Sequence, residues 1–147
     1  LVLVEEAFAT LRELMRDARD DVNAAEDMIK GSVAVLVEHI HAHPGQYRFI
    51  AREQYSAVLS VRLAIRRELR LFATELATDL ARLPVITTWT TADLVMLAEL
   101  IVGLMVDTSK RLLDVIDEGP EREPDLEADT ERRLRFLTIG ATAWKPR

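Results

Sequence analysis

The sequence contains 147 residues, carries a formal net charge of −6 at pH 7, and has 30% charged residues and no cysteine. That length suits a single domain with a core of its own, and the absence of cysteine excludes disulfides, thiolate catalysis and cysteine-ligated metals. The negative charge argues against a chain that binds nucleic acid over its whole surface.

The first helix is predicted over residues 1–19, from apolar residues three or four positions apart: Leu3, Ala7, Leu11, Leu14 and Ala18. This pattern is already present at residue 1 and no initiator methionine precedes it, so we expect a segment of a longer protein. The sequence "NAAE" at residues 23–26 fits a capping box that begins a second helix. The sequence "HPG" at residues 43–45 ends that helix, because the residue before a proline disfavours helical geometry.

A short third helix is predicted from Pro44, which suits a first helical turn, to about Tyr55. Ser56 is expected to cap a fourth helix, whose apolar stripe from Val58 to Leu83 is the clearest in the chain. We expect residues 84–91, "PVITTWTT", to form a loop, because no second strand is available to pair with their β-branched side chains.

Thr90, with Asp93 three residues later, predicts the start of a fifth helix that runs to about Asp117. Residues 118–125, "EGPEREPD", are typical of a charged loop. Asp125 is expected to cap a last helix that ends near Trp144. The predicted fold is therefore all-α, with six helices and no strand.

The fifth helix is apolar on nearly every side between residues 94 and 106, whereas a surface helix shows a single apolar stripe. Gly103 lies in its middle, where glycine costs about 1 kcal/mol relative to alanine, and the last helix also contains small residues. We therefore predict a homodimer through a four-helix bundle of the last two helices. The alternative is that both helices are central in a monomer. The predicted interface residues are Val102, Gly103, Met105, Leu134, Leu137, Gly140, Ala141 and Trp144.

The same apolar stretch contains Glu99 and is shorter than the ~20 residues that a helix needs to cross a bilayer. The first residues of the chain lack the basic region of a signal peptide. We therefore expect a cytoplasmic protein without a membrane partner.

The histidine cluster "EHIHAH" gives two weak metal-site patterns. Glu38 and His41 have the spacing of a di-iron bundle, but no second copy of that pattern exists in the chain. His39 and His43 lie one turn apart, although histidines are also favourable at a helix end without any metal. No phosphate-binding loop, nucleophile elbow or acid–base pair is evident. We expect no metal, no cofactor and no enzymatic activity.

Four arginines follow one another along the fourth helix: Arg62, Arg66, Arg67 and Arg70. They fit either an anion-binding stripe for the phosphates of a ligand or an ordinary solvated face. The solvated face is the favoured interpretation, because Glu68 and Glu75 are interspersed with them.

Three segments carry a family resemblance: "LVEEAFATLRELMRDAR", "HPGQYRFIAREQYSAVLSVRLAIRRELRLFATELATDL" and "RLRFLTIGATAW". They resemble the C-terminal domain of TetR-type transcriptional repressors. They are most similar to the subgroup that regulates unsaturated fatty acid synthesis, which includes the fatty acid biosynthesis repressor and the desaturase regulator. The resemblance covers most of the chain in order, and its specificity comes from length and order rather than from a catalytic signature.

The resemblance implies a homodimer through the last two helices and an effector pocket inside each helical domain. It implies long-chain acyl thioesters as the effector class, and a helix-turn-helix domain upstream of residue 1 that alone contacts operator DNA. Effector binding would shift helix packing and thereby the spacing of the two DNA-binding heads. The alternative is a helical dimerisation module without a ligand, which would be packed solid, whereas a ligand domain should contain an apolar cavity of several hundred Å³.

The short third helix, which carries Tyr47, Phe49 and Ile50, is suited to line or gate such a cavity. We expect an apolar tunnel walled by the first, second, fourth and fifth helices and closed by the third. Arg52 and Tyr55 would hold the polar end of the ligand near the mouth. The predicted wall residues, which are otherwise ordinary core residues, are Phe8, Leu11, Met15, Val33, Val37, Phe49, Leu63, Met96 and Leu100.

Overall fold

The computed structural model describes residues 2–20, 25–82 and 89–145. Six α-helices and one 3₁₀ turn follow one another along the chain: α1 (Val2–Asp20), α2 (Ala25–Ala42), α3 (Pro44–Glu53), α4 (Leu59–Leu80), α5 (Thr91–Glu118), η2 (Pro120–Arg122) and α6 (Glu123–Ala143). These described residues contain no strand, which confirms the predicted all-α class. None of the helices described is long and apolar enough to cross a membrane.

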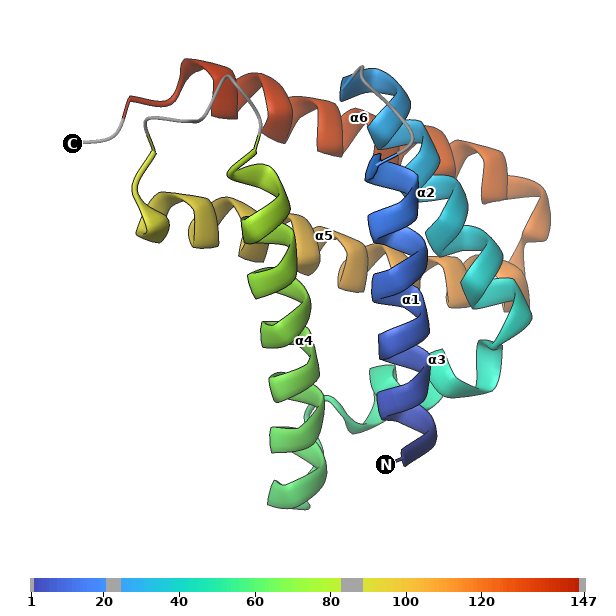
Figure 1. The fold of residues 1–147 in the computed structure, drawn as a ribbon. Coiled ribbons are helices and arrows are strands. Elements are labelled where there is room, and N and C mark those ends of the chain that lie inside the picture. Colours follow the sequence, from blue (N-terminus) through green and yellow to red (C-terminus); the bar gives the residue numbers. More distant parts are fainter. Residues whose placement is uncertain (1, 21–24, 83–88, 146–147) are drawn as a thin grey trace.

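Helix α5 is the central element of the bundle. It packs against both α4 and α6, while α2 packs against both α1 and α6. Figure 1 shows α5 and α6 running across the molecule, with α1 and α4 crossing in front of α5. The short helix α3 lies at the end of the bundle where the N-terminus is found.

Helix α5 contributes buried residues to two large apolar clusters. Buried residues of α1, α2 and α6 surround the C-terminal half of α5 at Leu112 and Leu113. Buried residues of α4 surround its N-terminal half at Leu97 and Ala98. A smaller cluster joins α1, α3 and α4 through Phe8, Ile50 and Ile65.

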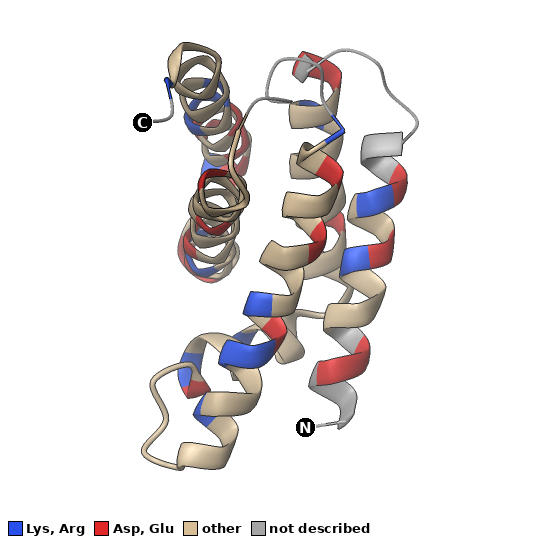
Figure 2. Ribbon diagram, turned by 60° about the vertical axis from the view of Figure 1, so that its left-hand side comes forward, with Lys and Arg blue, Asp and Glu red and all other residues tan. Residues whose placement is uncertain are grey.

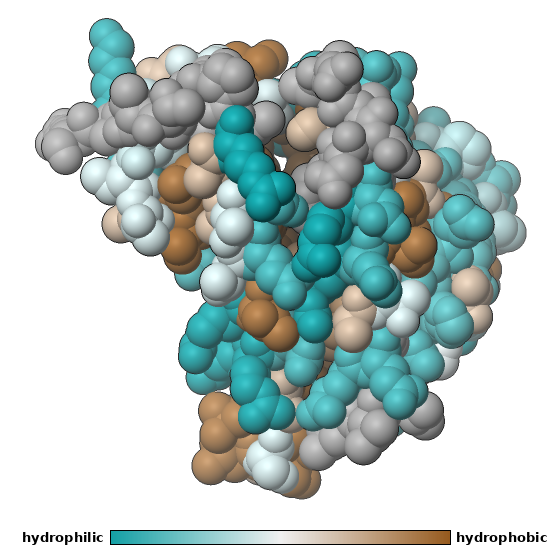
Figure 3. Space-filling view, viewed as in Figure 1, coloured by the Kyte–Doolittle hydropathy of each residue, from teal (hydrophilic) through white to brown (hydrophobic). Residues whose placement is uncertain are grey.

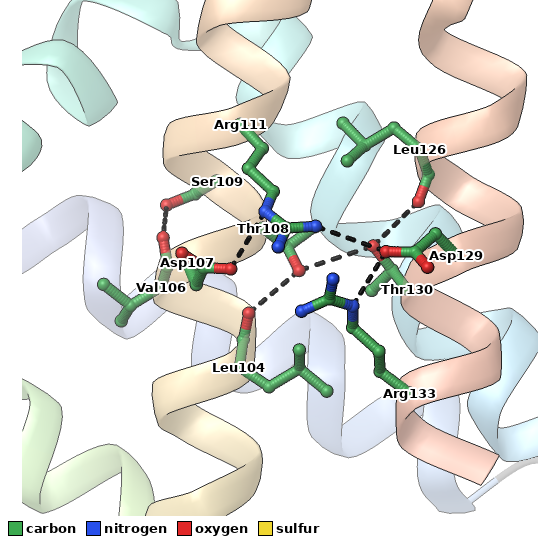
Figure 4. Close-up of polar contacts among 10 residues, drawn as sticks. All are labelled: Leu104, Val106, Asp107, Thr108, Ser109, Arg111, Leu126, Asp129, Thr130 and Arg133. Atoms are coloured by element: carbon green, nitrogen blue, oxygen red, sulfur yellow. Dashed lines mark hydrogen bonds and ion pairs between the residues drawn. The ribbon is translucent and has the colours of Figure 1, made fainter. Parts of the chain in front are cut away.

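Polar contacts fix the packing of α5 on α6 (Figure 4). The hydroxyls of Thr108 and Thr130 are buried, lie 3.4 Å apart, and each donates to a carbonyl of its own helix. At the rim, Arg111 and Arg133 both donate to Asp129, at 3.2 and 2.8 Å. Because every buried hydroxyl in this contact has a partner, α5 and α6 can meet without leaving a polar group unsatisfied.

Helix starts test the capping predictions. Pro44 begins α3, and Thr90 caps α5 by accepting a hydrogen bond from the Asp93 N–H at 3.2 Å, as predicted. The prediction for Ser56 was wrong, because its hydroxyl accepts from the Val58 N–H in a turn and α4 begins only at Leu59.

The predicted loop at residues 118–125 was also wrong in its second half. The η2 turn leads directly into α6, which begins at Glu123, so Asp125 lies inside the first helical turn rather than at the cap. The capping residue predicted for α2, Asn23, and residues 84–88 of the predicted loop at 84–91 lie outside the described residues.

Leu112 gives a test of the central cluster, because its side chain is fully buried where α5 meets its neighbours. Leu112→Ala should lower the free energy of unfolding by about 2–5 kcal/mol, through lost burial and the cavity left behind. Leu63→Ala on α4 is the matched control, since Leu63 is 46% exposed, and it should cost less than about 1 kcal/mol. Urea unfolding followed by circular dichroism measures both, and equal losses would contradict the proposed core.

Candidate functional site

A cavity of about 370 Å³ lies inside the bundle and is lined by side chains from all six α-helices. This volume is within the ordinary range for ligand sites, roughly 300–1,000 Å³. Most of its lining consists of leucine, isoleucine, valine, methionine and phenylalanine. No charged side chain is present among the lining residues that the structure describes.

The walls follow from helical periodicity. On α1, Phe8, Leu11 and Met15 are spaced by three and four residues, so they fall on one face, and all three are buried. On α5, the lining residues recur in the same way from Leu97 to Ser109. Because α5 is apolar on most of its sides, it can supply this wall and still pack against α4 and α6 on the others.

Ion pairs connect α1 to α4, the two helices that cross in front of α5. Arg12 contacts Glu68 at 2.9 Å and Glu75 at 3.4 Å, and Arg16 contacts Glu75 at 3.0 Å. The side chains of Arg12 and Glu68 are only 14% and 11% exposed, so the loss of Arg12 would leave the largely buried Glu68 carboxylate without this ion pair. Figure 2 shows charged residues of both signs along α1 and α4, and Figure 3 shows that the surface over these helices is largely hydrophilic.

Tyr47 is the one aromatic hydroxyl that lines the cavity, and it has a partner. Its hydroxyl lies 2.7 Å from Nδ1 of His39, and both side chains are buried. Burial raises the pKa of Tyr47, and burial, together with the nearby His43, lowers the pKa of His39. The pair is therefore neutral at pH 7, and the Tyr47 hydroxyl is engaged with His39.

The histidine patterns noted in the sequence have ordinary structural explanations. His39 contacts Tyr47, and Nε2 of the exposed His41 contacts Glu123 of α6 at 2.5 Å. The described residues contain no group of three histidine, cysteine, aspartate or glutamate side chains placed to hold a metal ion.

The residues predicted to line the pocket lie in three different environments in the structure. Phe8, Leu11 and Met15 line the cavity. Val33 and Val37 are buried in the adjoining core instead. The exposed members of the predicted set are Arg52, Tyr55, Leu63, Met96 and Leu100, none of which is among the lining residues described.

Helix rotation and helix length explain these placements. Leu63 lies on the side of α4 opposite the buried Ile65, because two residues along a helix differ by about 200° in direction. Tyr55 is 75% exposed because α3 ends before it, at Glu53. Arg52 pairs with Glu53 at 3.0 Å and lies over the ring of the partly buried Phe49.

Sequence reasoning missed several lining residues. Met28 and Ser32 of α2 line the cavity, as do Thr138 and Thr142 of α6. Met28, Ser32 and Leu36, another lining residue, follow one another at intervals of four residues, so helical spacing was the available signal for Met28 and Ser32. The threonines gave no such signal, because polar residues of a helix are expected at its surface.

Some of the residues predicted for a dimer interface are buried or partly buried within one chain, and the others are exposed. Val102, Met105, Leu134 and Ala141 line the cavity, with Val102 and Leu134 buried, and Leu137 is partly buried. Gly103, Gly140 and Trp144 are exposed. The adjoining exposed apolar residues are Leu100 at 51%, Phe136 at 77% and Ile139 at 63%.

Residues 25–140 match the family described as "Tetracyclin repressor-like, C-terminal domain". The chain belongs to this family. It is the C-terminal, ligand-sensing and dimerisation domain of a TetR-type transcriptional regulator. The resemblance found in the sequence is thereby confirmed at the level of the family.

The buried His39 makes stability depend on pH. Because its pKa in the folded protein lies below the ordinary value of 6.5, the unfolded chain binds a proton that the folded chain does not. The stabilisation is therefore complete above about pH 6.5 and is lost as the pH falls through the folded-state pKa. His39→Gln should flatten the loss of stability between about pH 7.5 and pH 5.5 relative to the wild type.

Urea unfolding midpoints at the two pH values measure this effect. His43→Gln is the control, and it should retain most of the dependence, because burial is the larger cause of the His39 shift. An unchanged pH dependence in His39→Gln would contradict the assignment.

Proposed function

We propose that this domain senses a long-chain fatty acyl thioester, such as an acyl-CoA, and controls a TetR-type repressor accordingly. The apolar cavity of about 370 Å³ is the observation that carries the proposal. A dimerisation module without a ligand would be packed to the density of other protein interiors, without a void of this size. The resemblance to regulators of unsaturated fatty acid synthesis supports the acyl class.

The chemistry of the lining supports an acyl group rather than a free fatty acid. A carboxylate buried in this cavity would meet no opposite charge among the described lining residues, at a high desolvation cost. A thioester carries the same chain without that charge, and its phosphate-bearing part can remain in solvent. Each buried CH₂ group contributes about 0.8 kcal/mol, and Met15, Met28 and Met105 can adapt to different chain shapes.

Helix α1 is suited to transmit occupancy of the cavity. Its inner face lines the cavity, and Arg12 joins its outer side to Glu68 and Glu75 of α4. A ligand that favours a different spacing of α1 and α4 would shift the position of a DNA-binding domain preceding α1. This is a population shift, and it requires the ligand to bind the two spacings with different affinity.

The dimer is proposed to form through the exposed face shared by α5 and α6. Gly103 on α5 and Gly140 on α6 are exposed, and a Cβ atom added at either would meet no atom of the described residues within 4 Å. Leu100, Phe136 and Ile139 supply the apolar contacts beside them. A second copy of these two helices would complete a four-helix bundle.

Ile139→Asp tests the dimer, because it would place a charge in the centre of the proposed interface. Sedimentation velocity at micromolar concentration should show a dimer for the wild type and a monomer for this variant. Leu71→Asp is the matched control on α4, where Leu71 is 40% exposed, and it should remain dimeric.

Gly140→Leu probes the same face by size rather than charge. The leucine side chain should clash with the second subunit and weaken the dimer. The helical content of the single chain should be unchanged, because no described atom of the chain lies within 4 Å of a Cβ at this position. A monomeric wild type would contradict the proposed interface.

Leu69→Trp tests the ligand site by filling the cavity. Leu69 lines it, and the larger ring should weaken palmitoyl-CoA binding by at least about tenfold. Leu71→Trp, two residues away and 40% exposed, is the matched control and should bind as the wild type does. Isothermal titration calorimetry measures both, with acetyl-CoA as the ligand that lacks a chain to bury. Equal palmitoyl-CoA affinity in the two variants would place the acyl site elsewhere.

A further inference from the structure

The walls of the cavity differ in polarity. The described lining residues of α1 and α4 are entirely apolar, and the only polar group from α3 is the Tyr47 hydroxyl, which is engaged by His39. The aliphatic hydroxyls come from the other three helices: Ser32 of α2, Ser109 of α5, and Thr138 and Thr142 of α6. A ligand therefore meets one apolar side and one side that carries neutral hydroxyl groups.

These four hydroxyls differ in where their protons are directed. Ser109 donates to a carbonyl of its own helix at 2.7 Å, Thr138 does so at 2.9 Å and Thr142 at 2.7 Å. Their oxygens can then only accept a further hydrogen bond. Ser32 has no hydrogen-bond partner in the part of the chain that the structure describes, so its proton is available to a ligand.

We infer that the cavity binds an uncharged, mainly apolar group with one hydrogen-bond acceptor, whether this group is a whole small molecule or the buried part of a larger ligand. We infer also that Ser32 donates to this acceptor and determines specificity. A hydroxyl left without a partner in a ligand-filled apolar cavity is unfavourable, so a ligand that offers an oxygen to Ser32 is preferred over one that does not. An ionised group has no counter-charge among the described lining residues. The inference rests on the proposed function only in that the ligand occupies this cavity; a thioester carbonyl is one such acceptor.

The position of Ser32 suits this role. Met28 and Leu36 lie one helical turn before and after it, and both line the cavity. A ligand that reaches Ser32 is therefore held by apolar contacts on both sides, which exclude water from the hydrogen bond. Such a bond discriminates between ligands more strongly than an exposed one.

The neutral ketone dye prodan provides a test that does not depend on the natural ligand. Prodan is mainly apolar, and its fluorescence shifts to longer wavelength when its carbonyl accepts a hydrogen bond. We expect the wild-type domain to bind prodan with a red-shifted emission. Ser32→Ala should shift that emission to shorter wavelength and weaken binding about fivefold, which corresponds to about 1 kcal/mol, and Ser32→Thr should restore both.

Two further variants define the site. Ser109→Ala should leave the prodan emission unchanged, because the Ser109 proton is directed to Val106 and prodan itself has no proton to donate. Leu69→Trp should abolish binding by filling the cavity. The inference is overturned if prodan does not bind, if it still binds to Leu69→Trp, if Ser32→Ala leaves the emission unchanged, or if Ser109→Ala produces the same shift.

Palmitoyl-CoA separates this inference from the proposed function. If prodan responds to Ser32 as expected but palmitoyl-CoA does not displace it, the acyl-thioester proposal fails and the inference stands. If palmitoyl-CoA displaces prodan and Ser32→Ala changes neither ligand, the inference fails and the proposed function stands. If both hold, Ser32→Ala should weaken palmitoyl-CoA about fivefold and leave S-hexadecyl-CoA, the thioether without the carbonyl, unaffected.

Discussion

Packing on both halves of α5 is the constraint on which the rest of the structure depends. Its N-terminal half is held by α4 around Leu97, and its C-terminal half is held by α1, α2 and α6 around Leu112. The two apolar clusters meet only partly, at Phe72 and Ile101, which contact both. The cavity is the space left between them, since its lining draws on residues of each cluster. One central helix thus provides both the stability of the domain and the room for a ligand.

The cavity has an apolar side, lined by α1 and α4, and a side with hydroxyl groups, and the packing of the helices accounts for this difference. Helices α1 and α4 place Arg12 and Arg16 against Glu68 and Glu75 away from the cavity, and the side chains that line the cavity from these two helices are all apolar. Helices α5 and α6 contact each other through buried hydroxyls such as Thr108, which are satisfied by carbonyls within their own helices. The hydroxyl groups that α5 and α6 present to the cavity are likewise polar but uncharged, within a lining that is mostly apolar.

Periodicity was enough to predict the helices but not which side of each helix faces inward. The fold class and the start of α5 at Thr90 were predicted from local patterns, because capping and proline geometry act within a few residues. On α1 the apolar face is unambiguous, and its predicted wall residues do line the cavity. On α5 almost every position is apolar, so the pattern could not distinguish Leu100, which is exposed, from Ile101, which lines the cavity. Spacing could have placed Ser32 on the wall, but it could not predict that the Ser32 hydroxyl has no partner among the described residues, because hydrogen bonding is visible only in three dimensions.

The proposed dimer face and the cavity lie on the same two helices. On α6, Ala141 lines the cavity, whereas the neighbouring Gly140 is exposed. On α5, Val102 lines the cavity, whereas Gly103 is exposed. Each glycine costs about 1 kcal/mol of helix stability relative to alanine, and no described part of the chain approaches either one closely enough to require it. A second copy approaching at these positions would account for both. A ligand that displaces α5 or α6 from inside would then act directly on the contact between subunits, so occupancy of one cavity and the geometry of the dimer would be coupled through a single helix pair.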